Sequence, residues 1–371
     1  MTTSQVEFTE AEILADADTT EALIAGGVRC HGGFDDEGRY VSPRTKHRVP
    51  GIVAWQDKHR EEFGKDIIDI PLETWPEHYP NLAQAEHLIR SGVPEPLIAT
   101  LTRIGTVEGF GANIRHLQPG DMQRHFDESI RGTTIEHLGR GLFEAHGRDE
   151  AGWEQEAGHK DMWFAARDIA FENPTTKVDI DEMLQRMGFG QAQAAGGGGS
   201  SSFLGERVLP DDIDANLEAV ANLMTRVLLI EIQAFHTFKW AETWLSDSTL
   251  VAGDGEAARL VTYIRGDETP HVGYLKTGLT EMRDRTWIGA SGKKYDGEDL
   301  FRPIWDRALA NSLGAGREMT RKAALGEVEH WCAKKANGAE ILEQFHALGD
   351  EPAPAEVSDI DEAAAKAATS Y

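Results

Sequence analysis

The chain has 371 residues, of which 40% are hydrophobic, so it is long enough for one large domain or two ordinary ones. Its formal net charge is −26, which argues against nucleic acid or an anionic membrane as the main partner. Two cysteines, Cys30 and Cys332, exclude a disulfide framework and a cysteine-type zinc site. The acidic N-terminus and the lack of an apolar run of about 20 residues predict a soluble, cytoplasmic protein without membrane contact.

The first 90 residues are expected to form an N-terminal segment that wraps around the rest of the chain. Residues 1–80 have weak periodicity and many turn formers, which predicts little regular structure. The basic stretch "RTKHR" at 44–48 is short and is interpreted as a solvated surface.

Residues 91–285 are predicted to form the main helical unit. The spacing of apolar residues predicts helices near 95–112, 149–171, 210–245 and 255–282, with a more polar helix at 121–146. No strand pairs are predicted, so the expected fold class is all-α.

Three other segments complete the predicted organisation. The connection at 173–210 contains "GGGGSSS", a tract that cannot pack into a core. Residues 286–349 are predicted to form a C-terminal helical extension, and 350–371 a disordered acidic tail.

Two apolar helices carry a glutamate in matching sequence contexts. "TRIGTVEG" contains Glu108, and "TRVLLIEI" contains Glu231. A buried carboxylate is costly unless it is paired or binds a metal. Two of them in similar contexts therefore indicate a duplicated helical hairpin with a repeated role.

Each of these helices is followed by a Glu-x-x-His sequence. The first is "EAGH", from Glu156 to His159, and the second is "ETPH", from Glu268 to His271. Residues i and i+3 lie on one face of a helix, so each pair is expected to point at one place. Pro270 interrupts the second motif and predicts a local distortion of the helix that positions His271.

This ordered set of residues resembles the ferritin-like superfamily of carboxylate-bridged dinuclear iron (diiron) proteins. In that fold, two helices of a four-helix bundle each supply a Glu and the other two each supply Glu-x-x-His. The resemblance implies a ferritin-like bundle over 91–285, with the Gly-rich segment as its crossover and extra helices at both ends. It implies two iron ions, with manganese or a mixed iron–manganese pair as the alternative, held by Glu108, Glu156, His159, Glu231, Glu268 and His271.

The identity of the first ligand stays open at this stage. Glu108 and Glu156 are separated by 48 positions, so the polar helix at 121–146 would be an insertion between paired helices. If that helix is itself the partner, Glu136 or Glu144 becomes the first ligand. The repeat and the more apolar helix favour Glu108. His146 is interpreted as an ordinary core histidine.

The resemblance also implies a function. It favours a non-haem diiron oxidase or monooxygenase that activates O2 to oxidise a small organic substrate. No Gly-rich dinucleotide fingerprint is present, so electrons would come from an external reductase or ferredoxin. A homodimer is compatible with this interpretation. The alternatives are a ferroxidase-like metal-handling protein and a non-catalytic helical binding protein.

Overall fold

The computed structural model describes residues 5–72, 75–175, 180–183 and 207–349. The protein is mostly helical, with 62% helix and 8% strand, which confirms the mainly helical class. Most of the predicted crossover at 173–210 and the whole predicted tail at 350–371 lie outside the described residues.

The N-terminal part contains more regular structure than the sequence predicts. Its elements are α1 (Glu10–Ile13), β1 (Glu21–Ala25), β2 (Val28–Phe34), β3 (Tyr40–Val41), α2 (Arg48–Phe63) and α3 (Leu82–Arg90). The strands form an antiparallel sheet in the order β1-β2-β3. Gly26 and Gly27 both have positive φ, as a two-residue hairpin turn requires, and join β1 to β2. The prediction of no strand pairs is therefore wrong.

The central part consists mainly of six helices. They are α4 (Glu95–Gly111), α6 (Phe143–Ala151), α7 (His159–Ala170), α11 (Ala215–Leu245), α12 (Glu256–Asp267) and α13 (Thr269–Arg283). The region predicted as one polar helix at 121–146 is broken into short pieces instead. These pieces are a 3-10 turn at Met122–His125, α5 (Thr134–His137) and a kinked π-type turn at Leu138–Leu142.

Helix α11 is the central helix of the fold. Asp214 caps its N-terminus by accepting hydrogen bonds from the backbone N–H groups of Asn216 and Leu217. Buried residues occur on most sides of this 31-residue helix, and it packs against α12, α13 and α14. A helix that is apolar nearly all round belongs in the interior.

The α12–α13 pair confirms the helix distortion predicted at Pro270. Helix α12 ends at Asp267, Glu268 lies at the junction, and Pro270 is in the first turn of α13. A proline in this position has no N–H to donate, so the helix is interrupted beside Glu268.

The connection between α6 and α7 folds back tightly on the end of α6. A Cβ atom on Gly158 would lie 2.2 Å from the backbone nitrogen of Gly152 and 2.5 Å from the carbonyl oxygen of Asp149. Gly152 itself has φ 82°. These two glycines allow residues 152–158 to form a compact loop that returns His159 to the end of α6.

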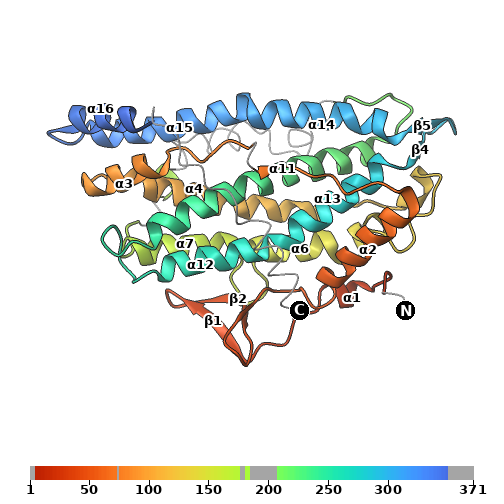
Figure 1. Ribbon diagram of the computed structural model, residues 1–371, viewed down its shortest axis with the longest axis horizontal. Coiled ribbons are helices and arrows are strands. Elements are labelled where there is room, and N and C mark those ends of the chain that lie inside the picture. The colour runs from red at the N-terminus through yellow and green to blue at the C-terminus, as the bar shows by residue number, and fades with distance from the viewer. Residues whose placement is uncertain (1–4, 73–74, 176–179, 184–206, 350–371) are drawn as a thin grey trace.

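The C-terminal elements cover one long side of the molecule. They are β4 (Thr286–Ile288), β5 (Lys294–Asp296), α14 (Gly297–Leu313), α15 (Ala315–Cys332) and α16 (Gly338–Gly349). Figure 1 shows α14, α15 and α16 running along one edge, whereas β1 and β2 lie at the opposite edge. Helix α14 packs against α11, and α15 packs against α4. Within the described part of the chain, every helix is too short or too polar to cross a lipid bilayer.

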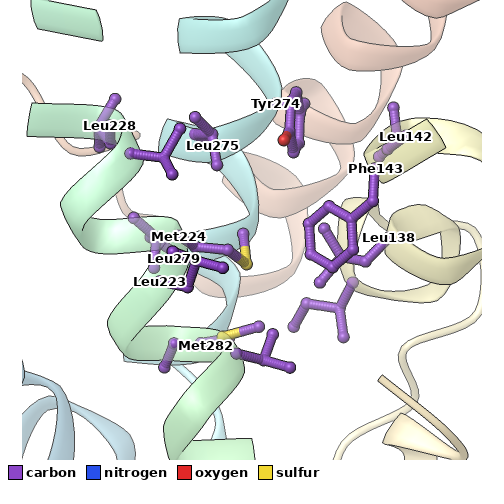
Figure 2. Close-up of a cluster of buried hydrophobic side chains, with 14 of the residues drawn as sticks. Leu138, Leu142, Phe143, Leu223, Met224, Leu228, Tyr274, Leu275, Leu279 and Met282 are labelled. Carbon is purple, nitrogen blue, oxygen red and sulfur yellow. The ribbon is translucent and has the colours of Figure 1, made fainter. Parts of the chain in front are cut away.

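The hydrophobic core has two main parts that meet along α11. Residues of α11 up to Ile232 join the first, which includes α13 and the start of α6. Figure 2 shows side chains from this part, among them Met224, Leu275 and Phe143. Residues of α11 from Phe238 onward join the second, with α4, α7 and α12. A band of buried polar side chains occupies the level between them.

Candidate metal centre

The polar band contains three groups of metal-ligating side chains. In each group, one ligand atom from every residue lies within 4.8 Å of the others. Two groups share Glu150: the first is His146, Glu150, Glu231 and His271, and the second is Glu108, Glu150, His159 and Glu268. The third is His31, His159 and Asp267. If two ions were bound, Glu150 would be the carboxylate common to the first two groups.

The two histidines at the centre present the same ring nitrogen to the carboxylates. Nδ1 of His159 lies 2.8 Å from Oε1 of Glu268 and 3.3 Å from Oε1 of Glu150. Nδ1 of His271 lies 2.6 Å from Oε2 of Glu268 and 3.3 Å from Oε1 of Glu150. Glu150 and Glu268 therefore each contact both imidazoles, and they are the carboxylates that would be shared if two metal ions were bound.

The opposite nitrogen of each histidine faces an aspartate. Nε2 of His271 lies 2.8 Å from Oδ2 of Asp149, and Nε2 of His159 lies 3.5 Å from Oδ2 of Asp267. Histidine ligands to metals commonly donate their second N–H to a carboxylate, which fixes the tautomer and the ring orientation. With Nε2 of each ring facing an aspartate, Nδ1 is the nitrogen that would bind a metal ion in place of the proton it shares with Glu268.

The two aspartates reveal an internal repeat. Asp149 directly precedes Glu150, and Asp267 directly precedes Glu268. In both halves the helix is interrupted beside the Asp-Glu pair, and a histidine lies in the first turn of the next helix. Each aspartate supports the histidine of the other half of the site. Asp149 contacts His271, and Asp267 contacts His159.

The N-terminal part connects the two aspartates. Nε of Arg44 donates a 2.7 Å hydrogen bond to Oδ1 of Asp149, and Nη2 of Arg44 donates to Nδ1 of His31 at 3.3 Å. Arginine can only donate, so Nδ1 of His31 must accept, and Nε2–H of His31 donates to Oδ2 of Asp267 at 3.0 Å. The hydroxyl of Tyr40 donates to the same oxygen at 2.9 Å. Arg44 therefore contacts Asp149 directly and is linked to Asp267 through His31.

The basic stretch at 44–48 is therefore not the solvated surface that the sequence predicts. Arg44 is 2% exposed and Arg48 is fully buried. Nη2 of Arg48 lies 2.7 Å from Oδ2 of Asp149. Two buried guanidinium groups oppose the charge of the aspartate and, although burial acts in the opposite direction, hold the pKa of Asp149 well below its ordinary value.

A third histidine extends the group around His271. The ring of His146 stacks on that of His271 with centroids 3.9 Å apart, and its Nε2 lies 3.4 Å from Oε1 of Glu231. Burial, together with the neighbouring His271, lowers the pKa of His146 to about 3, so its imidazole is neutral and able to bind a metal. His146 therefore lies among the candidate ligands and is not the ordinary core histidine that the sequence analysis expects.

In the absence of a metal ion, the pKa values of three of the four glutamates depart strongly from those of ordinary carboxylates. Burial, and after it the charge of Glu150, raises the pKa of Glu108 well above its usual range. Burial and the charge of Glu268 do the same to the pKa of Glu231. Burial would also raise the pKa of Glu268, but His159 and His271 outweigh it and hold that pKa well below its ordinary value. The cluster therefore retains protons that cations would displace.

Five of the six residues predicted as ligands come together in this cluster, and Glu156 does not. Residues 152–158 are a loop, so the i, i+3 relation of a helix does not apply to "EAGH". The side chain of Glu156 is one-third exposed and pairs with Arg29 at 3.0 Å. Glu150, which the sequence analysis missed, lies where Glu156 was expected. The repeated Asp-Glu pair is the sequence signal that could have identified it.

The two alternatives for the first ligand lie outside the cluster. Glu136 pairs with Arg140 at 2.6 Å, and Glu144 pairs with Arg148 at 2.7 Å. Both are ion pairs between residues four apart along the chain. Of the three glutamates considered, Glu108 is the one that the structure brings to the other ligating side chains.

The first prediction separates Glu150 from Glu156. We expect Glu150→Gln to lose at least half of the bound metal, because both groups of ligands lose a carboxylate oxygen. Glu156→Gln should keep the wild-type stoichiometry. Elemental analysis after reconstitution with Fe(II) or zinc and removal of free metal measures both. Full metal occupancy in Glu150→Gln together with loss of metal in Glu156→Gln would show that Glu156 is the ligand, as the Glu-x-x-His motif predicts.

The second prediction concerns the support from Arg44. Arg44→Gln should weaken metal binding by about 10- to 100-fold, because Asp149 loses a direct partner and His31, which supports Asp267, loses the donor at its Nδ1. Arg39→Gln is the matched control, since Arg39 is exposed and pairs only with Asp35 and Glu37. Competition titrations with a chromophoric chelator give the affinities, and thermal unfolding reports whether the variants are folded. Equal zinc affinity in folded Arg44→Gln and wild type would contradict the role of Arg44.

The third prediction is a pH dependence. Glu108 and Glu231 have raised pKa values, so they hold protons at higher pH than ordinary carboxylates and must lose them when metal binds. Zinc binding near pH 7 should therefore release protons, and the apparent affinity should rise with pH. Calorimetric titrations in two buffers of different ionisation enthalpy count these protons. Glu231→Gln should release fewer protons than wild type, whereas a zinc affinity that is independent of pH would be incompatible with this description.

Comparison of the chain with protein-family models, with curated proteins and with solved structures returned no match. The identification of a candidate metal centre therefore depends on the geometry and chemistry of the residues themselves.

Proposed function

We propose that this protein is a ferritin-like dinuclear metal oxidoreductase that holds two iron ions and activates O2 to oxidise a small organic substrate. The observation that carries the proposal is the pair of ligand groups that share Glu150. Four carboxylates neutralise two divalent cations, and oxygen-rich sites with imidazole suit iron or manganese. The candidate ligands come from α4, α6–α7, α11 and α12–α13, which supports a ferritin-like arrangement in which two helical hairpins each supply two ligand-bearing segments.

When bound, a pair of ferrous ions supplies the electrons that reduce O2. The chain supplies the surroundings in which this chemistry is controlled. Asp149 and Asp267 orient His271 and His159, and the two apolar parts of the core exclude water from either side. Hydroxylation of a C–H bond by O2 takes two electrons from the substrate, two electrons from the ferrous pair and two protons, with water as the second product. An external reductase or ferredoxin would deliver the electrons.

A cavity beside the cluster favours an organic substrate over simple metal handling. Its volume is about 520 Å³, and Glu108 forms part of its wall. Cavities of this size accommodate small organic ligands. A ferroxidase-like protein needs a path for ions but has no need of a largely apolar chamber lined by residues such as Ile104, Val107 and Leu229.

The fourth prediction tests the redox proposal. After anaerobic loading with two equivalents of Fe(II), exposure to O2 should cause rapid O2 consumption and a new near-ultraviolet absorbance. The double variant Glu231→Gln/Glu268→Gln should show neither, and Glu136→Gln, a carboxylate outside the cluster, should match wild type. The measurements are an oxygen electrode trace and stopped-flow absorbance.

Other outcomes of this experiment identify the alternatives. Continued oxidation of added Fe(II), with accumulation of many iron ions per chain, would favour the ferroxidase. Equal metal content in wild type and in the double variant would end the dinuclear proposal and favour a metal-free helical binding protein.

A further inference from the structure

The cavity that reaches Glu108 has both basic and apolar lining residues. Arg317 and Arg321 on α15 line it and are exposed. Ile104, Val107 and Leu229 give it an apolar wall. The cavity therefore offers positive charge and apolar surface to one ligand.

One cation in the wall of this cavity has no counter-ion among the described residues. Arg103 lines the cavity from α4, is partly buried, and has its Nε shielded from solvent without a hydrogen-bond partner in that part of the chain. Burial lowers the pKa of Arg103 to about 10, which leaves it charged at neutral pH. A guanidinium that loses part of its hydration without a compensating anion is costly. An anion from outside the chain would remove this cost.

The neighbouring side chain does not provide that anion. His78 also lines the cavity, and its Nδ1 forms a 3.0 Å hydrogen bond with Oγ1 of Thr237. Burial, and after it the charge of Arg103, lowers the pKa of His78 to about 3, so its ring is neutral. Glu77, another residue of the wall, is exposed at the surface and forms no ion pair with Arg103 in the described part of the chain.

The position of Arg103 relative to Glu108 fits a small molecule that extends between them. Both residues are on α4, five positions apart, which corresponds to a rise of about 7.5 Å along the helix. The apolar residues Ile104 and Val107 lie in the sequence between them. A ligand with an anionic group at Arg103 and an apolar body along this wall would place its far end near Glu108.

We propose that the cavity binds an organic carboxylic acid, with Arg103 as the residue that holds the carboxylate and the apolar body directed toward Glu108. This inference rests on the proposed function for what happens at Glu108, but the binding itself does not require a metal. A guanidinium binds a carboxylate through paired, charge-assisted hydrogen bonds. The charge of Arg103 matches one negative charge, and the apolar wall matches a hydrocarbon body.

The fifth prediction compares two probes of nearly the same shape, 3-phenylpropionate and its uncharged analogue 3-phenylpropionamide. Wild type should bind the acid at least about tenfold more tightly than the amide, because charge-assisted hydrogen bonds discriminate by this amount or more. Arg103→Gln should bind both equally, and Arg103→Lys should retain part of the preference. Arg317→Gln, which changes an exposed residue of the same cavity, should change the preference by less than about threefold.

Calorimetry measures these affinities on metal-free and on zinc-loaded protein, so that binding to the metal and binding to Arg103 are separated. Circular dichroism and elemental analysis confirm that the variants are folded and retain metal. Lack of acid binding by wild type, equal affinity for both probes, or a preference that persists in folded Arg103→Gln would overturn the inference. If the zinc-loaded state cannot be formed but metal-free wild type prefers the acid, the dinuclear proposal fails and the carboxylate site stands.

Discussion

Mutual repulsion among four clustered glutamates is the constraint on which this structure depends. Glu150, Glu231 and Glu268 are buried and Glu108 is partly exposed at the cavity wall, so water screens their charges only weakly. Protons and imidazoles compensate this charge when no metal is bound, and two divalent cations would compensate it directly. A protein that needed only a stable core would be better served by apolar residues at these positions. The arrangement therefore indicates a functional role.

The surrounding architecture keeps this cluster in one geometry. Asp149 and Asp267 each support a histidine from the other half of the site, and Arg44 contacts Asp149 directly and Asp267 through His31. The N-terminal sheet and α2 thus provide the outer layer of the site. Deletion of this part would expose the cluster and remove the charges that oppose the aspartates.

Periodicity and motif spacing predicted the parts of the site where the helical repeat is kept. Glu108 and Glu231 lie on regular helices, α4 and α11, and Glu268 and His271 keep their i, i+3 relation because only Glu268 separates α12 from α13. Glu156 was misassigned because two glycines turn the chain back at the end of α6, and no helical rule describes that loop. The burial of Arg44 and Arg48 depends on contacts with Asp149, about 100 positions away, which single-sequence patterns do not reveal. The ligand assignment itself remains a prediction until metal is measured.

A crystal structure of the iron-loaded protein, with anomalous data collected on both sides of the iron edge, tests the central claim most directly. We predict two anomalous peaks between Nδ1 of His159 and Nδ1 of His271, with Glu150 in contact with both. It also predicts Asp149 on Nε2 of His271 and Glu156 still paired with Arg29 at the surface. No peak in the cluster, or a peak coordinated by Glu156 with Glu150 outside the site, would contradict it.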